Sequence, residues 1–333
     1  MSGKNRRKEE VMKVRAARLM APRKWQLIEE EKPQAKPGNM LVRIQRVAIC
    51  GSDKPSFCGF HESYPLPTGT TGHEGLGIVE ACPSGTYKEG ERVLLSGFDR
   101  GLFQEYVLAN DHGVVRLPQD FSPEVVLLSQ LLGTVIHSFY KLGNVINQRV
   151  VVLGQGAVGL LFDAVLRNLG ARQIIGVDLL DYRLDLGRRM GATHTINPHK
   201  QSVAEAVTQI TEGELADLVV EAVGEEETLN QIHLLARRNA SVICFGVPDK
   251  GSHDGRVSLG FMDMFRKELR LITSVGPEPW KDYTIARDWI VQGRLDLSPV
   301  VSHVRPFETI QESFEMAFDY PEEDKVVKIV LKF

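Results

Sequence analysis

The sequence predicts an α/β fold class, in which a doubly wound parallel sheet is joined to a smaller, mainly β region. Strand-like and helix-like segments alternate from residue 149 onward, the pattern of parallel strands linked by crossover helices. A glycine-rich loop at residues 154–159 separates the first of these strands from the first helix. Up to about residue 118, short strand-like segments are broken by turn residues at close intervals, as in a small barrel or sandwich.

The mainly β region contains a clear example of strand periodicity at residues 40–49. Apolar and polar side chains alternate there, as they do in a strand with one buried face, and a break at Pro37 and Gly38 precedes it. This strand delivers Cys50 at its end. Further strands are expected at residues 14–19, 25–28, 75–80 and 91–95.

The parallel-sheet region follows a helix predicted to begin at Ser122 and Pro123 and to run to about Leu142. A capping serine and a proline in the first turn favour that start. Strands are then expected at residues 149–153, 173–178, 218–221, 241–245 and 269–273, and helices at 157–169, 182–190, 202–210 and 227–237. The last fifty residues are expected to form helices near 282–292 and 308–318 and a terminal strand at 326–331.

Length, charge and cysteine content argue against a nucleic-acid-binding, membrane-spanning or disulfide-rich protein. With 333 residues the chain is long enough for two cores, and a net charge of -3 argues against nucleic-acid binding because no large positive field is available. No run reaches the roughly 18 apolar residues of a membrane span. Four cysteines at irregular spacing provide no disulfide framework, so a reducing, cytoplasmic location is expected. Basic residues at positions 1–12 predict a disordered tail, with a targeting or partner-binding arm as the alternative.

The glycine-rich loop has the spacing of a dinucleotide-binding fingerprint, at Gly154, Gly156 and Gly159. The first glycine permits a tight turn, the second lets the backbone approach a pyrophosphate, and the third lets helix and strand pack closely. Asp178 ends the next predicted strand, where a carboxylate can bind the ribose hydroxyls of NAD and repel the 2′-phosphate of NADP. Arg183 could bind a phosphate instead. The alternative interpretation is a structural turn beside a chance surface acid.

Further cofactor contacts are expected where the other strands of the parallel sheet end, because ligands bind beyond the carboxyl ends of such strands. The alternative for these positions is an ordinary loop. The candidates are Val158 in the glycine loop and, at the later strand ends, Val223, Phe245, Gly246 and Ser274.

Cys50 and His73 offer metal-ligand chemistry, although each residue type alone is more often structural. Their surroundings, Cys50-Gly51-Ser52-Asp53 and residues 72–79, resemble signatures of the zinc-containing medium-chain dehydrogenase/reductase family of alcohol and polyol dehydrogenases. The resemblance covers nearly the whole chain after residue 12. It includes segments 101–107, 154–159, 190–193 and 304–308.

The resemblance implies a GroES-like catalytic domain, mainly β, that is interrupted by a Rossmann domain. Its boundaries would be 13–145 for the first catalytic part, 146–280 for the Rossmann domain and 281–333 for the return to the catalytic domain.

By the same resemblance, zinc is held by Cys50, His73 and Glu74, with the fourth position open to water or substrate. Ser52 then passes on the substrate proton, and Asp53 is a carboxylate beside the metal that orients His73. Thr134 would approach the nicotinamide.

Three departures from the family pattern bear on the site. Only a few residues separate segments 93–95 and 101–103, where relatives carry a four-cysteine lobe, so no structural zinc is expected. Gln130 occupies the position of a further ligand, and because a neutral amide is a poor zinc ligand, Glu74 is the expected third one. Gln130 would then hydrogen-bond zinc-bound water or simply pack. A relay histidine is replaced near Pro55, which leaves Ser52, the ribose, water or His61 for proton exit.

The predicted function is hydride transfer between NAD(H) and a secondary alcohol or polyol, or the corresponding ketone. The alternatives are a metal-free quinone or enone reductase of the same fold and a non-catalytic nucleotide-binding protein. Phe57, Phe60 and Tyr64 are expected to line the substrate pocket. The family resemblance suggests a homodimer or homotetramer formed through the edge of the Rossmann sheet near residues 269–273.

Overall fold

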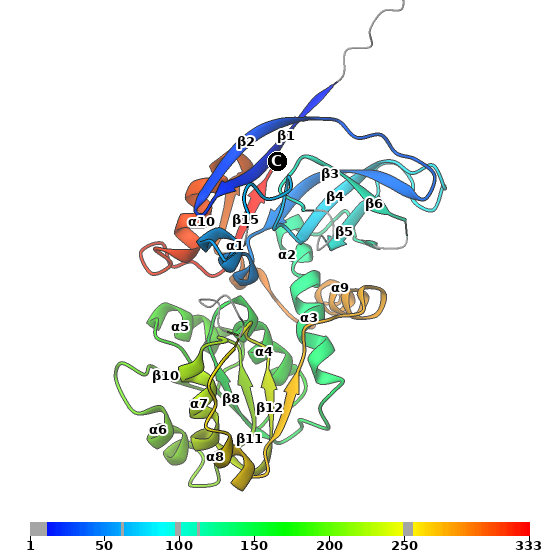
Figure 1. The fold of residues 1–333 in the computed structure, drawn as a ribbon. Coiled ribbons are helices and arrows are strands. Elements are labelled where there is room, and N and C mark those ends of the chain that lie inside the picture. The colour runs from blue at the N-terminus through cyan, green and yellow to red at the C-terminus, as the bar shows by residue number, and fades with distance from the viewer. Residues whose placement is uncertain (1–11, 61–62, 97–100, 112–113, 249–255) are drawn as a thin grey trace, which may run out of the picture.

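The computed structural model describes residues 12–60, 63–96, 101–111, 114–248 and 256–333, and these form two lobes (Figure 1). Residues 1–11 of the predicted tail, and His61, therefore lie outside the described residues. The first and last parts of the chain share the upper lobe of Figure 1, and the middle of the chain forms the lower lobe. An α/β fold with one mainly β lobe and one doubly wound lobe confirms the predicted fold class.

The upper lobe contains a seven-stranded sheet with the order β14-β15-β3-β4-β5-β7, in which β6 also pairs with β3. A separate β1-β2 hairpin packs beside it. Helix α10 (Ile310–Phe318) covers this hairpin and β15, and its Phe314 is fully buried against Trp25 and Phe103. The strands are β1 (Lys13–Ala21), β2 (Lys24–Glu31), β3 (Asn39–Ala48), β4 (Glu74–Ala81), β5 (Arg92–Ser96), β6 (Tyr106–Asn110), β7 (Val114–Arg116), β14 (His303–Pro306) and β15 (Ile329–Lys332).

The lower lobe is built on six parallel strands in the order β10-β9-β8-β11-β12-β13, which is the 3-2-1-4-5-6 order of a Rossmann sheet. The strands are β8 (Arg149–Leu153), β9 (Gln173–Val177), β10 (His194–Ile196), β11 (Ala216–Glu221), β12 (Ala236–Cys244) and β13 (Arg270–Thr273). The helices are α4 (Ala157–Asn168), α5 (Asp181–Met190), α6 (Val203–Ile210), α7 (Glu226–Leu235) and α8 (Phe261–Arg266).

Strand β8 shows why this sheet needs helices on both faces. Val150 and Val152 belong to one hydrophobic cluster, and Val151 and Leu153 belong to another on the opposite face. Successive side chains of a strand point to opposite faces, so an unbroken apolar run is buried only when both faces are covered. The strand order changes direction between β8 and β11, and sheets of this kind bind ligands in the crevice beyond the carboxyl end of the strand at that point.

Two crossovers join the lobes (Figure 1). Helix α3 (Ser129–Phe139) carries the chain downward, and a π-turn at Pro279–Tyr283 followed by α9 (Thr284–Val291) brings it back. Gly133 allows these segments to touch, because a Cβ there would lie 2.5 Å from the Tyr283 ring and 2.9 Å from the Asp282 carbonyl carbon. Among the described residues, no helix has the length and apolar composition to cross a membrane.

Several predicted elements differ from those observed, among them two helices and the terminal strand. The helix expected at 122–142 is two helices, α2 (Pro123–Leu127) and α3. The helix expected to reach residue 237 ends at Leu235, because Ala236 already pairs with Ala216 as a strand residue. The terminal strand begins at Ile329 rather than 326, because Ser302 Oγ accepts the amides of residues 327 and 328.

Candidate functional site

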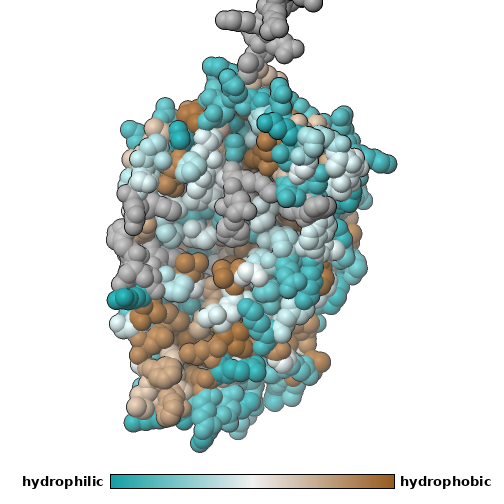
Figure 2. Space-filling view, turned by 45° about the vertical axis from the view of Figure 1, so that its right-hand side comes forward, coloured by the Kyte–Doolittle hydropathy of each residue, from teal (hydrophilic) through white to brown (hydrophobic). Residues whose placement is uncertain are grey.

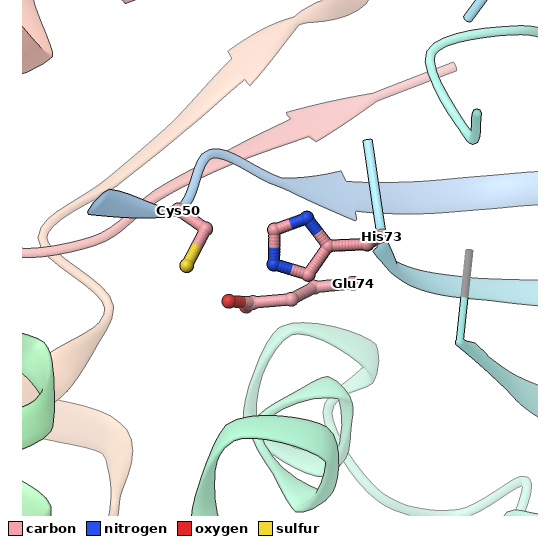
Figure 3. A group of neighbouring side chains, drawn as sticks. All are labelled: Cys50, His73 and Glu74. Carbon is pink, nitrogen blue, oxygen red and sulfur yellow. The ribbon is translucent and has the colours of Figure 1, made fainter. Parts of the chain in front are cut away.

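Cys50, His73 and Glu74 meet where two neighbouring strands end in the upper lobe (Figure 3). Strand β3 pairs with β4 in antiparallel register, with Ala48 opposite Glu74, so the segment after β3 lies beside the segment before β4. One ligand atom from each of the three side chains lies within 4.8 Å of the others. His73 and Glu74 are buried and Cys50 is half-buried. Thiolate, imidazole and carboxylate at this separation are a donor set that suits zinc.

The imidazole of His73 is fixed in one orientation. Its Nδ1 lies 3.0 Å from the Thr71 carbonyl oxygen and 3.5 Å from Asp53 Oδ1, so Nδ1–H donates to the carbonyl. Nε2 is then the nitrogen on the side of the ring where a metal ion would bind, and Figure 3 shows one ring nitrogen facing Cys50 and Glu74. Ser52 Oγ lies 3.3 Å from Nε2, beside the position of a metal ion.

Asp53 holds the two ligand segments together. Its Oδ2 accepts the backbone N–H of Cys50 at 2.8 Å, and its Oδ1 accepts the Thr71 hydroxyl at 2.6 Å. Burial lowers the pKa of His73, but the Cys50 thiol and Asp53 together outweigh burial and raise it. Because a ligating imidazole must be neutral, a proton competes with a metal ion at this site.

Lys328 is a member of this site that sequence reasoning missed. Its Nζ lies 2.7 Å from each carboxylate oxygen of Glu74, and both side chains are buried. Burial opposes the charge on Lys328, but Glu74 and then Cys50 outweigh it and raise the pKa of Lys328. The available signal was a lone lysine between Val327 and Ile329 in an apolar terminal segment.

Gln130, at the start of α3, lies in a second polar group beside Glu74. Gln130 Nε2 donates to Tyr283 Oη at 3.2 Å, while Gln130 Oε1 has no partner among the described residues. The Tyr283 hydroxyl also contacts the Ser96 side chain, and burial raises the pKa of Tyr283. Ser96 is the cross-strand partner of Glu74, so their side chains share one face of the sheet. Sequence reasoning missed Tyr283 because it comes from a π-turn far along the chain.

The glycine loop joins β8 to α4 as predicted. Gly154 has a φ of +89°, which favours glycine, and a Cβ on Gly159 would overlap the carbonyl oxygen of Gly154. Asp178 follows β9 and faces the loop. Its Oδ2 accepts the Gln155 backbone N–H at 2.7 Å and its Oδ1 accepts that of Leu180 at 3.0 Å.

The other predicted cofactor residues surround this loop. A Cβ on Gly154 would lie 2.8 Å from the Val223 side chain, and the backbones of Gly224 and Gly246 are in direct contact. Val158 lies in the first turn of α4, Phe245 follows β12, and Ser274 follows β13 with a buried hydroxyl that has no partner among the described residues.

Arg183 makes contacts with both lobes. Its Nε donates to the Tyr182 hydroxyl at 3.1 Å and its Nη2 donates to the Val326 carbonyl at 3.2 Å. The ion pair with Asp178 is longer, at 3.8 Å. The guanidinium therefore ties α5 of the lower lobe to the C-terminal segment of the upper lobe.

One predicted pocket residue is misplaced. Phe57 is fully buried in the upper core, with its ring 5.2 Å from that of Phe314, so it does not line a substrate pocket. The one-turn helix at Lys54–Cys58 directs this side chain inward. Tyr64 is half-buried and donates to the Ser56 carbonyl at 2.6 Å.

Comparisons with known proteins match both lobes. A family model described as an alcohol dehydrogenase GroES-like domain matches residues 36–119, and one described as a zinc-binding dehydrogenase matches residues 157–292. L-threonine 3-dehydrogenase from Pyrococcus abyssi is 27% identical over 324 residues, which span 87% of this chain and 91% of that protein.

Solved structures agree with this match. An alcohol dehydrogenase from Thermus sp. ATN1 has a TM-score of 0.82 and 25% identity, covering 96% of this chain and 99% of its own. L-idonate 5-dehydrogenase from Escherichia coli has a TM-score of 0.84 at 21% identity, covering 97% of this chain and 99% of its own. The chain therefore belongs to the zinc-containing medium-chain dehydrogenase/reductase family of alcohol and polyol dehydrogenases, enzymes that transfer a hydride between an alcohol or its ketone and a nicotinamide cofactor.

Proposed function

We propose that this enzyme oxidises a secondary alcohol or polyol, or reduces the corresponding ketone, with NAD(H) and a single zinc ion held by Cys50, His73 and Glu74. The observation that carries the proposal is the convergence of these three ligand atoms within 4.8 Å at a buried strand end. When bound, the zinc ion lowers the pKa of an alcohol at its open position, and the nicotinamide accepts the hydride.

The surrounding residues prepare the site for this chemistry. Asp53 accepts the backbone N–H of Cys50 and the side-chain hydroxyl of Thr71, so both ligand segments are held before substrate arrives. Ser52 Oγ, at 3.3 Å from His73 Nε2, is placed to receive the alcohol proton. Lys328 places a buried positive charge 2.7 Å from both carboxylate oxygens of Glu74.

We propose NAD rather than NADP as the cofactor because of Asp178. The carboxylate lies at the end of β9 beside the glycine loop, where the adenosine ribose of a dinucleotide binds. A 2′-phosphate there would be repelled by the carboxylate, and the nearby Arg183 is already bound to Tyr182 and Val326.

The proposed substrate class also draws on the relatives. L-threonine 3-dehydrogenase and L-idonate 5-dehydrogenase are both named for dehydrogenation at an internal carbon, which supports a secondary hydroxyl as the reacting group.

In the part of the chain that the structure describes, Cys58, Cys82 and Cys244 lie outside the ligand cluster, which supports a single zinc ion. Four free thiols also support a reducing, cytoplasmic location.

The test combines metal analysis with a substrate panel. Purified protein should hold about one zinc per chain and reduce NAD in preference to NADP with a secondary alcohol or polyol. Cys50→Ser should lose both the zinc and the activity, and the matched control Cys82→Ser should retain both. Turnover of quinones or enones without metal would support a metal-free reductase, and NAD binding without turnover of any alcohol or carbonyl compound would support a binding protein.

We further propose that the enzyme is a homodimer, or a homotetramer built from such dimers, with β13 at the interface. This strand ends the six-stranded sheet, so among the described elements one of its edges is unpaired. Apolar side chains gather on the lower half of the face in Figure 2. Exposed apolar residues on and around α8 and β13 are Leu259, Phe261, Met262, Phe265, Leu271 and Val275.

A further inference from the structure

The side chain of Gln155, the second residue of the glycine loop, is buried in the core of the lower lobe. Here it enters a space between β9 and α5 that exists because two residues lack a Cβ. A Cβ on Gly176 would lie 2.8 Å from the Gln155 amide carbon, and a Cβ on Gly187 would overlap Gln155 Oε1.

Asp163 of α4 lies at the end of this buried side chain. Asp163 is fully buried, contacts the Gln155 amide, and would lie 3.4 Å from a Cβ on Gly187. Gln155 Nε2 lies 3.4 Å from the Gly154 carbonyl oxygen, and the same amide is the hydrogen-bonding group beside Asp163. Among the described residues, Gln155 Oε1 and the two Asp163 oxygens have no closer polar partner.

Burial favours the neutral form of the Asp163 carboxyl, because the Gln155 amide is the one polar contact that the described residues give it and an ionised carboxylate there would be costly. A neutral carboxyl can donate an O–H and accept an N–H, so it can bond the Gln155 amide in either orientation. Burial raises the pKa of Asp163 well above its ordinary value, and the Gln155 hydrogen bond opposes this rise without outweighing it.

The backbone of Gln155 is anchored as well, because its N–H donates to Asp178 Oδ2 at 2.7 Å. Asp178 is the carboxylate proposed to bind the ribose. We propose that the buried Asp163–Gln155 hydrogen bond is a positioning device for the cofactor, which holds the glycine loop and Asp178 in their binding arrangement before the dinucleotide arrives. Asp163 and Gln155 are positioning residues, since they act through the loop.

The test measures NADH binding directly, by fluorescence titration, and separately measures KM for NAD and kcat at saturating NAD. Asp163→Leu and Gln155→Leu should each weaken NADH binding and raise KM for NAD about ten-fold, the factor associated with one buried hydrogen bond. The kcat should stay within about two-fold. Asp163→Asn keeps a donor toward Gln155 and should bind NADH as the unmodified enzyme does.

Two further variants separate positioning from general stability. Gly187→Ala alters neither polar residue but pushes on Gln155, so it should also weaken NADH binding. Thr211→Val removes a buried hydroxyl that donates to the Val207 carbonyl in the same lobe, and it should lower stability without changing NADH affinity.

The proposal is overturned if folded Asp163→Leu and Gly187→Ala bind NADH as tightly as the unmodified enzyme, or if Asp163→Asn is as defective as Asp163→Leu. Because NADH binding needs neither zinc nor an alcohol, this result is independent of the proposed metal site. Loss of turnover with intact NADH binding would count against the proposed function and leave the positioning role standing.

Discussion

Lys328 and Glu74 form a buried ion pair beside the proposed zinc, and the two residues are 254 positions apart in the chain. Breaking a buried pair leaves one uncompensated charge, and this is more costly than the loss of an exposed pair. Loss of Lys328 should therefore reduce the free energy of unfolding less when zinc is bound, because a zinc ion would offer Glu74 a second positive partner.

The variant Lys328→Met tests this dependence. In chelator-treated protein it should lower the free energy of unfolding by about 3–5 kcal/mol, and the loss should be smaller in zinc-loaded protein. Urea unfolding of both forms measures the difference. The control Arg238→Ala removes an exposed ion pair with Glu268 and should change the free energy of unfolding far less in both forms. Equal losses for Lys328→Met with and without zinc would contradict ligation by Glu74.

Asp163 should leave a signature in the pH dependence of stability. Its raised pKa means that the folded state keeps a proton that the unfolded chain releases, so stability falls as pH rises from about 3.9 through the folded pKa. Asp163→Asn lacks this loss, and its stability relative to the unmodified enzyme should increase with pH across that range.

A contrasting carboxylate provides the control for this pH experiment. Hydrogen bonds from the Ser298 side chain and backbone lower the pKa of Asp296, so its stabilisation is lost as pH falls. Urea unfolding across the pH range should therefore give Asp296→Asn the opposite trend. A pH-independent difference for Asp163→Asn would show that Asp163 is ionised in the folded enzyme.

At the scale of elements, the contact between α3 and the π-turn at 279–283 connects the two lobes. Gln130, Gly133 and His137 lie on one face of α3, at spacings of three and four residues. Gln130 bonds Tyr283, and His137 Nδ1 lies 2.8 Å from Asp282 Oδ2. The π-turn therefore places both of its buried polar side chains on α3, and Tyr283 also contacts Ser96.

Gly133→Ala should disrupt this contact. Its Cβ would meet the Tyr283 ring at 2.5 Å and backbone atoms of Asp282, which cannot move aside easily, so a loss of about 1–3 kcal/mol in unfolding free energy is expected. Gly143→Ala is the matched control, because a Cβ there meets nothing within 4 Å. Urea unfolding compares the two. Equal stabilities would show that the crossovers can separate without cost.

At the scale of the whole molecule, the exposed apolar surface around α8 and β13 predicts an interface between copies of this chain. Phe265→Glu places a charge in its centre, where Phe265 is 68% exposed, and should convert the dimer to a monomer in sedimentation equilibrium. Tyr320→Glu changes an exposed aromatic outside this surface and should leave the mass unchanged. An unmodified enzyme that is monomeric, or a Phe265→Glu variant that stays dimeric, would reject this interface.

Much of the fold was predictable from local pattern. The apolar run at 149–153, the glycine spacing that follows it and the later alternation of strands and helices specify a Rossmann sheet, because they depend on neighbouring residues alone. Element ends were less predictable. The helix α7 ends at Leu235 because the next residue, Ala236, pairs with Ala216. The last strand begins only at Ile329 because the preceding amides are bonded to Ser302. No local pattern contains these long-range partners.

The sequence by itself determined the candidate ligands and the cofactor loop, since Cys50, His73 and Glu74 stand beside strands and the glycines have fixed spacing. Only the tertiary structure decided what surrounds them. Lys328 reaches Glu74, Tyr283 reaches Gln130 across 153 residues, and Asp163 meets a buried Gln155. Side chains that are distant in the chain become neighbours only when strands and crossovers pack, because burial and charge pairing act between surfaces rather than along the sequence.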